Sequence, residues 1–288
     1  MSDFERVGVI GCGVMGSGIA EVFARAGCSV VVREVSDEAL DAGRARIERS
    51  LARATRGGKI EEAAASLALA RIAYTTEFAP MGDRELVIEA VAEIEALKAE
   101  VFAALDAVVE DRAAVFASNT SSIPIVRLAV ATRRPAQVLG LHFFNPVPVM
   151  ALVEVIPTLL TSEETTRRAR ACVRDRLGKH VVEAQDRAGF VVNALLVPYL
   201  LAAIRMCEAG VASAVDIDAG MREGCAHPMG PLALADFIGL DTLASVADVL
   251  YDEHRDPSFV APPLLRRMVD AGQLGRKSGA GFHHYEDR

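Results

Sequence analysis

The feature of this chain that most constrains its fold is a glycine-rich loop between a short strand and a helix. The predicted strand is Val7–Ile10, the loop is Gly11-Cys12-Gly13-Val14-Met15-Gly16, and helical spacing then continues to Ala24. A second predicted strand, residues 28–33, has Glu34 at its carboxyl end. A lone G-x-G-x-x-G pattern is a weak signal, but in this order of elements it predicts a dinucleotide-binding unit.

Each glycine of the loop has its own physical reason. Gly11 permits the tight turn after the strand, and Gly13 lets a pyrophosphate approach the backbone at the helix N-terminus. Gly16 lets the helix pack closely on the strand. We therefore expect the loop to bind the cofactor, together with Val14 and Met15 in the first helical turn.

Glu34 indicates which dinucleotide the unit binds. It follows Gly16 by eighteen residues and is placed to accept hydrogen bonds from the hydroxyls of the adenosine ribose. Because a carboxylate repels a 2′-phosphate, we expect NAD rather than NADP as the cofactor. Arg33 is adjacent, but side-chain alternation along a strand points it to the opposite face.

Strand signals continue to about residue 183 and then stop. The further expected strands are residues 71–74, 86–88, 114–117, 138–143, 152–156 and 180–183. The first several alternate with helical stretches, which predicts a parallel sheet with right-handed crossovers. We therefore predict an α/β protein in which residues 1–186 form a Rossmann-like, doubly wound NAD-binding domain. Residues 187–288 are expected to form an all-helical domain for substrate binding and dimerisation.

A helix pair at about residues 36–70 is inserted into the first domain. Its first helix carries Arg46, Arg49, Arg53 and Arg56 on the face opposite an apolar stripe, and Lys59 follows. Such a face usually serves only solubility. In a chain with a formal net charge of −8, solubility alone is a weaker explanation for an aligned row of arginines.

The composition argues against several classes of protein. The net charge of −8 disfavours a nucleic-acid binder. The five cysteines are scattered without C-x-x-C pairing, which gives no metal motif and fits a reducing cytoplasm. The N-terminus has no signal-peptide core, and the longest apolar run, Asn193–Ile204, is too short to span a bilayer. We expect a soluble, cytoplasmic protein that binds no metal, nucleic acid or membrane.

The segment Gly140–Ile156 carries the clearest chemical signal. His142 lies near the end of one predicted strand and Glu154 lies within the next, separated by an Asn-Pro-Val-Pro turn. A carboxylate inside an apolar strand is costly unless something pairs with it, and His142 is the natural partner. Such a pair orients an imidazole for proton transfer near neutral pH. From these two residues alone, a core histidine beside an unrelated glutamate is the alternative.

The string His142-Phe143-Phe144-Asn145-Pro146-Val147-Pro148 resembles the active-site segment of the 3-hydroxyacyl-CoA dehydrogenases. The resemblance extends from Val7 to Tyr285 and implies that His142 is catalytic and that Glu154 orients it. It also implies NAD as the cofactor and an acyl-CoA substrate, of the short-chain 3-hydroxybutyryl-CoA type.

The resemblance implies roles for further residues of the first domain. Glu93 and Lys98 match positions that contact the nicotinamide half of the cofactor, although a solvated helix lysine is the alternative for Lys98. Ser121 matches a residue that bonds the 3-oxygen of the substrate. The polar run Ser118–Ser122 can also cap the next helix through Ser121 or Ser122. Asn145 is likewise expected at the cofactor.

The substrate residues implied by the resemblance lie in two places. Arg53 matches a basic position that binds coenzyme A phosphates, and Arg56 and Lys59 are near it in the sequence; a solvated arginine face is the alternative. Asn193 matches an asparagine that completes the site around the thioester, the alternative being a local bond within its helix.

We therefore predict NAD-dependent oxidation of L-3-hydroxyacyl-CoA to 3-ketoacyl-CoA, or the reverse reaction. One alternative is a related dehydrogenase of a free 3-hydroxy acid such as L-gulonate. The row of arginines on the inserted helix argues weakly against it. The other is a non-catalytic dinucleotide-binding structural protein, against which the presence together of His142, Glu154, Ser121 and Asn193 argues. The apolar surface of the helical domain predicts a homodimer.

Overall fold

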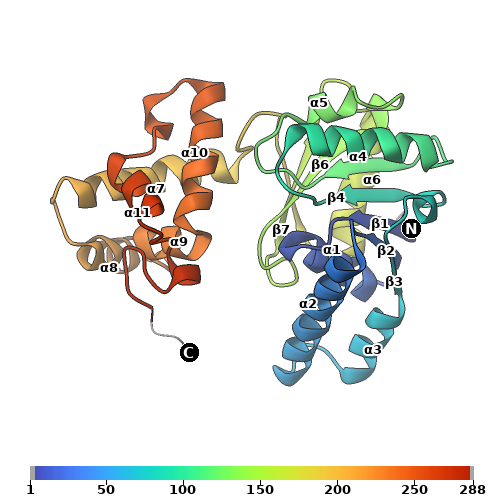
Figure 1. The fold of residues 1–288 in the computed structure, drawn as a ribbon, viewed down its shortest axis with the longest axis horizontal. Coiled ribbons are helices and arrows are strands. Elements are labelled where there is room, and N and C mark those ends of the chain that lie inside the picture. Colours follow the sequence, from blue (N-terminus) through green and yellow to red (C-terminus); the bar gives the residue numbers. More distant parts are fainter. Residues whose placement is uncertain (1–3, 286–288) are drawn as a thin grey trace. The chain divides into compact units, whose positions relative to one another are not determined.

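The computed structural model describes residues 4–285 of the chain. The chain divides into two compact units, Met1–Arg187 and Ala188–Arg288 (Figure 1).

An eight-stranded sheet forms the centre of the first unit. Its strand order is β3-β2-β1-β4-β5-β6-β7-β8, and every neighbouring pair is parallel except β6 with β7. The strands are β1 Arg6–Ile10, β2 Ser29–Arg33, β3 Ile72–Thr75, β4 Leu86–Glu89, β5 Val115–Ser118, β6 Val138–Phe143, β7 Leu152–Pro157 and β8 His180–Glu183. The predicted fold class, a doubly wound α/β sheet followed by a helical region, is confirmed.

Helices connect the parallel strands of the first unit. They are α1 Val14–Arg25, α2 Asp37–Arg56, α3 Glu62–Ala70, α4 Glu95–Val108, α5 Ile125–Ala129 and α6 Glu163–Ala171. The helices α2 and α3 form the pair inserted between β2 and β3, and Figure 1 shows them side by side at the end of the unit away from α4 and α5. The Ser36 side chain caps α2 by accepting a hydrogen bond from the Ala39 N–H.

The central strands are buried along their whole length, since helices cover a parallel sheet on both faces. All four residues of β4 and all four of β5 are buried, including Glu89 and Ser118 at their carboxyl ends. Polar groups at this edge therefore need partners within the protein, and the candidate site is built from those partners.

The second unit is all-helical within the described residues. Its helices are α7 Val192–Glu208, α8 Ala214–Cys225, α9 Pro231–Ile238, α10 Leu240–His254 and α11 Pro263–Asp270. They enclose a separate apolar core that includes Leu200, Leu201 and Ile204 of α7. The Ser213 side chain caps α8 by accepting a hydrogen bond from the Asp216 N–H, and the helix ends at Cys225, with Ala226 in the left-handed region. None of the helices within residues 4–285 combines the length and the apolar character needed to cross a bilayer.

Candidate active site at the carboxyl edge of the sheet

The glycine loop between β1 and α1 has the geometry that a dinucleotide pyrophosphate requires. Gly11 has a φ of +90°, and a Cβ added there would lie 2.7 Å from the carbonyl oxygen of Ala90. A Cβ on Gly16 would collide with the Gly11 carbonyl oxygen. A Cβ on Gly13 would meet nothing within 4 Å, and no side chain caps the α1 N-terminus that begins there. The loop thus leaves open space over helix N–H groups that favour an anion.

Glu34 lies beside this loop at the end of β2. Its carboxylate accepts hydrogen bonds from the Cys12 N–H at 2.5 Å and from the Val35 N–H at 3.0 Å. Arg33 points elsewhere, because its guanidinium stacks over the Phe78 ring at 4.3 Å. Burial, with the Glu34 charge adding to it, raises the pKa of the Cys12 thiol to about 12, so this cysteine stays protonated and unreactive.

A buried acid–base cluster joins the ends of β4 and β5. Glu89 is fully buried; its Oε1 lies 2.7 Å from the Lys98 Nζ, and its Oε2 accepts a hydrogen bond from the Ser118 hydroxyl at 2.6 Å. Lys98 is 1% exposed, and its Nζ also lies 3.2 Å from a carboxylate oxygen of Glu93. The alternative of a solvated helix lysine is therefore wrong for Lys98. Its main partner, Glu89, was not singled out from the sequence.

Glu93 collects hydrogen bonds from the polar run after β5. Its Oε1 accepts from the Thr120 hydroxyl at 2.5 Å, from the Ser121 N–H at 3.1 Å and from the Ser122 hydroxyl at 3.1 Å. Burial acts to raise the pKa of Glu93, but the charge of Lys98 and these hydrogen bonds outweigh it and lower the pKa below its usual value. Glu93 therefore stays ionised at neutral pH.

The cap of α5 does not come from the polar run, which corrects one expectation. Ser122 is engaged with Glu93, and the carboxylate of Asp186 instead accepts hydrogen bonds from the Ile125 and Val126 N–H groups, both at 2.8 Å. The helix has no side-chain cap at its own N-cap position, which is Pro124. Local spacing could not reveal this, since Asp186 lies about sixty residues further along the chain.

His142 and Glu154 face each other across the only antiparallel pair of the described sheet. They are register partners in β6 and β7, and the His142 Nδ1 lies 2.6 Å from the Glu154 Oε2. Glu154 is fully buried and His142 is 6% exposed. A carboxylate at Nδ1 favours the tautomer that keeps a proton there, which makes Nε2 the basic nitrogen. The pair can therefore work as a general base that its own carboxylate orients.

The turn between β6 and β7 is held in place from two sides. The Lys179 Nζ donates to the carbonyl oxygens of Val147 and Met150, at 2.8 and 2.6 Å. Before the turn, the Asn119 side chain accepts a hydrogen bond from the Phe143 N–H at 2.9 Å. Asn145 lies between these supports. The supporting contacts of Lys179 and Asn119 could not be predicted from the sequence, because each hydrogen bond joins residues at least two dozen positions apart.

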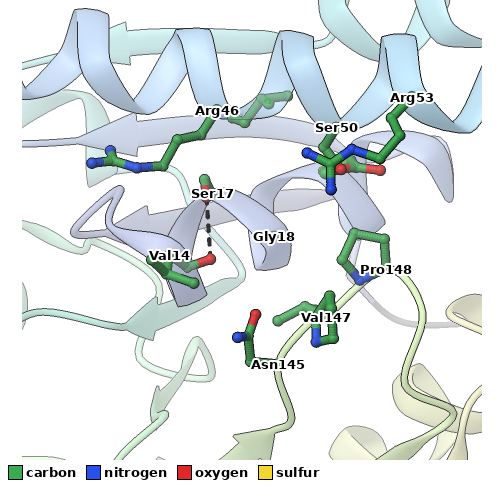
Figure 2. A pocket seen from close by; sticks show the side chains of 12 residues that line it. Val14, Ser17, Gly18, Arg46, Ser50, Arg53, Asn145, Val147 and Pro148 are labelled. Carbon is green, nitrogen blue, oxygen red and sulfur yellow. Dashed lines mark hydrogen bonds between the residues drawn. The ribbon is translucent and has the colours of Figure 1, made fainter. Parts of the chain in front are cut away.

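A groove of about 170 Å³ lies between α1, α2 and the Asn145–Pro148 turn (Figure 2). Arg53 lines it, whereas Arg56 and Lys59 are exposed outside its lining. Arg46 also lines the groove, and its guanidinium donates to the Cys12 carbonyl oxygen at 3.2 Å. The structure thus puts one of the three predicted coenzyme A residues in a cavity beside the glycine loop.

Asn193 belongs to the second unit, near the start of α7, where its side chain is partly exposed. Its predicted role at the thioester stays a prediction, as do the predicted contacts of Val14, Met15, Ser121 and Asn145 with ligands. Among the described residues no group of three or more His, Cys, Asp or Glu side chains could hold a metal ion.

Two family models together match almost the whole chain. The NAD-binding domain of 3-hydroxyacyl-CoA dehydrogenase matches residues 6–187, and the C-terminal domain of the same family matches residues 189–285.

Relatives of known sequence or structure are similar over the same length. The 3-hydroxybutyryl-CoA dehydrogenase of Mycobacterium tuberculosis is 56% identical over 286 residues, which cover 99% of this chain and all of the relative. The probable 3-hydroxybutyryl-CoA dehydrogenase of Deinococcus radiodurans is 47% identical, covering 97% of this chain and all of the relative. The crystal structure of FadB2 from M. tuberculosis superimposes with a TM-score of 0.97, covering 98% of this chain and 99% of that one, at 56% identity. That of (S)-3-hydroxybutyryl-CoA dehydrogenase PaaH1 from Ralstonia eutropha has a TM-score of 0.93 at 44% identity, covering 99% of this chain and 100% of that one.

Proposed function

The chain belongs to the 3-hydroxyacyl-CoA dehydrogenase family, and we propose that it interconverts L-3-hydroxybutyryl-CoA and acetoacetyl-CoA with NAD. It is an NAD-dependent oxidoreductase that acts on a CH–OH group, as its full-length relatives are. The observation that carries the proposal is the buried His142–Glu154 pair, with its 2.6 Å contact, in the same unit as a dinucleotide loop.

The residues present fit NAD. The open space over Gly13 and the uncapped N-terminus of α1 suit a pyrophosphate, and Glu34 suits the adenosine ribose hydroxyls. The guanidinium of Arg33 is held against Phe78, which leaves the Glu34 carboxylate to disfavour a 2′-phosphate. When bound, NAD supplies the acceptor for the hydride that leaves C3 of the substrate.

His142 supplies the acid–base chemistry of the proposal. In the oxidative direction its Nε2 takes the proton of the 3-hydroxyl group, and Glu154 at Nδ1 stabilises the imidazolium that forms. In the reductive direction the same nitrogen returns the proton. The Glu154 carboxylate keeps its position beside His142 throughout, because it lies in a strand paired directly with that of His142.

The remaining site residues position the two ligands. We assign Ser121 and Asn193 to the substrate, and Val14, Met15, Glu93 and Asn145 to the cofactor. Ser121 donates its N–H to Glu93, and this contact supports assigning the two residues to ligands that meet at one site. Lys98 acts through Glu93, since its side chain is 1% exposed and its ammonium group lies between two carboxylates.

The coenzyme A nucleotide needs a basic surface in a chain whose net charge is −8. We assign this role to Arg53, Arg56 and Lys59, which are exposed at and just after the end of α2. This surface favours a coenzyme A thioester over a free 3-hydroxy acid, which carries no nucleotide phosphates.

The direct test is NADH oxidation with acetoacetyl-CoA, compared with longer 3-ketoacyl-CoAs and with free 3-keto acids. We expect the highest kcat/KM with acetoacetyl-CoA and much lower values with NADPH as the reductant. Turnover of free acids that equals turnover of the thioester would instead favour a dehydrogenase of free 3-hydroxy acids. No turnover of any of them would favour a binding protein.

We further propose that the protein is a homodimer through its helical unit and works in the cytoplasm. The second unit exposes large apolar side chains such as Leu195, Val211 and Val215, and two-fold dimers are the commonest way to cover them. All five cysteines are free thiols, as a reducing compartment requires. Light scattering at micromolar concentration should report twice the mass of the chain.

A further inference from the structure

Within the described residues, the last part of β6 has a strand partner on one side only. On the β7 side the pairing continues to Phe143, which faces Val153. On the β5 side it stops at Gly140, which faces Ser118, the last residue of β5. His142 and Phe143 therefore lie beyond the end of the parallel ladder. Phe143 is 2% exposed, so its N–H needs a partner within the protein.

A side chain takes the place of the missing strand. Asn119 directly follows the end of β5, and its Oδ1 accepts a hydrogen bond from the Phe143 N–H at 2.9 Å. The N–H of Asn119 itself donates to the Glu89 carbonyl oxygen of β4, also at 2.9 Å. Asn119 therefore links the carboxyl ends of β4 and β6, with its backbone bonded to one strand and its side chain to the other.

The neighbours of Asn119 in the sequence bind different partners. The Ser118 hydroxyl donates to the Glu89 carboxylate at 2.6 Å. The Thr120 hydroxyl donates to the Glu93 carboxylate at 2.5 Å. The side chain of Asn119, between these two residues, reaches β6 instead. This short run therefore joins the buried acid–base cluster at the ends of β4 and β5 to the end of β6.

The hydrogen bond to Asn119 holds the peptide that follows His142. The Phe143 N–H and the His142 carbonyl group belong to one planar peptide unit, so Asn119 fixes the backbone on one side of the His142 Cα. Glu154 fixes the imidazole at Nδ1, at 2.6 Å, and the Phe144 ring lies beside it with 4.5 Å between the ring centroids. A fixed backbone and a fixed Nδ1 together determine the direction of Nε2.

Building on the proposed function, we infer that Asn119 is a positioning residue of the reaction. Its side chain holds the His142 backbone so that Nε2 faces a substrate oxygen bound at Ser121. Ser121 follows Asn119 by two residues, so one short run sets both the base and the residue assigned to the 3-oxygen. Proton transfer requires this alignment, because a base has to lie within hydrogen-bond reach of the proton that it takes. Asparagine supplies the acceptor without adding a charge.

The test compares two substitutions of similar size. Asn119→Leu removes the acceptor, whereas Asn119→Asp keeps an acceptor oxygen in the same place. Because a misplacement of about 1 Å can cost on the order of 10²-fold, we expect Asn119→Leu to lower kcat for acetoacetyl-CoA reduction about 10- to 100-fold. The KM for acetoacetyl-CoA and the Kd for NADH should stay near the wild-type values. Asn119→Asp should keep most of the wild-type kcat when each variant is measured at its own pH optimum.

The His142→Gln background separates positioning from a general loss of stability. Adding Asn119→Leu to it should lower kcat little further, because residues that act as one unit are non-additive. Thr161→Val is the matched control at the other end of β6, where the Thr161 hydroxyl donates to the Val138 carbonyl oxygen at 2.6 Å. It removes a hydrogen bond to the same strand, so it should lower Tm and leave kcat unchanged.

Several results would overturn the assignment of Asn119. Normal kcat in Asn119→Leu, or equal losses in Asn119→Leu and Asn119→Asp, would show that the acceptor does not position the base. A full further loss in the His142→Gln background, or a raised KM with normal kcat, would show that Asn119 acts on something other than His142. Asn119→Ala removes the same acceptor and replaces Asn119→Leu if that variant folds poorly. Failure of the wild type to reduce acetoacetyl-CoA would instead count against the proposed function.

Discussion

Among the buried acid–base pairs of the first unit are His142 with Glu154 and Lys98 with Glu89, and each has a contact of 2.6 to 2.7 Å. The two pairs differ in whether the basic side chain has a second nitrogen that can exchange a proton. The Lys98 ammonium is bounded by Glu89, by Glu93 and by the Val91 carbonyl oxygen, and a lysine ammonium is a donor only. An imidazole has two distinct nitrogens, so one can be held while the other exchanges a proton.

The comparison teaches that burial and pairing do not by themselves mark a catalytic group. Lys98 is the more deeply buried base of the two, yet its contacts suit it only to fix Glu93 and the polar run after β5. Glu154 fixes His142 in the same manner, but the group that it fixes has a second functional atom. The predictions below test this division between a pair that reacts and a pair that supports.

The largest effect on activity should come from His142→Gln. General acid–base catalysis contributes about 10²- to 10⁴-fold, so kcat should fall by at least that order. Affinity for NADH should stay near the wild-type value, because the glycine loop and Glu34 are untouched. Steady-state kinetics with acetoacetyl-CoA and fluorescence titration with NADH measure the two quantities. Normal turnover would remove His142 from proton transfer, and a loss of NADH binding with normal kcat would move it to the cofactor site.

Glu154→Gln should lower kcat as well, since it keeps the shape but removes the charge that stabilises the imidazolium. The double variant with His142→Gln should lose much less than the product of the two single effects, because the residues act as one unit. The same kinetics measure it, and multiplicative losses would show that Glu154 acts independently of His142.

Lys98→Met should mainly affect stability, in contrast to the first two variants. It leaves Glu89 fully buried without its counter-charge, and breaking a buried pair in this way costs about 3–5 kcal/mol. Thermal unfolding should show a Tm lowered by roughly 10 °C. Lys59→Met, which changes an exposed lysine, is the matched control and should leave Tm unchanged.

The double variant Lys98→Met with Glu89→Gln sharpens this result. Removing both charges should recover much of the lost Tm, because the fully buried position of Glu89 then carries no uncompensated charge. A Tm that stays as low as in Lys98→Met would mean that the lysine stabilises the unit by packing instead.

The smallest effect concerns the pH dependence of stability through Glu93. The pKa of Glu93 is lowered in the folded protein. The stability that ionised Glu93 contributes is therefore fully present above its pKa in the unfolded chain, and it is lost as the pH falls through its pKa in the folded protein. The difference in Tm between wild type and Glu93→Gln should therefore be largest near neutral pH and shrink below about pH 4.5. A difference that is constant over this range would contradict the ionised state of Glu93.

The sequence by itself determined the elements whose signals are local. The glycine spacing from Gly11 to Gly16 predicts a turn and a helix start, and a Cβ at either of these two positions would clash with the backbone. His142 and Glu154 could be paired because they lie in successive strands joined by a short turn. An antiparallel ladder of that length brings such positions opposite each other.

Only the tertiary structure decided which distant groups satisfy the buried polar atoms. Sequence patterns could not supply Asp186 as the cap of α5, Lys179 as the support of the active-site turn, or Glu89 as the partner of Lys98. The Asn119 side chain as the partner of the Phe143 N–H was equally hidden. Periodicity specifies which face of an element is apolar, whereas these contacts depend on the order in which strands assemble and on which helix ends then meet.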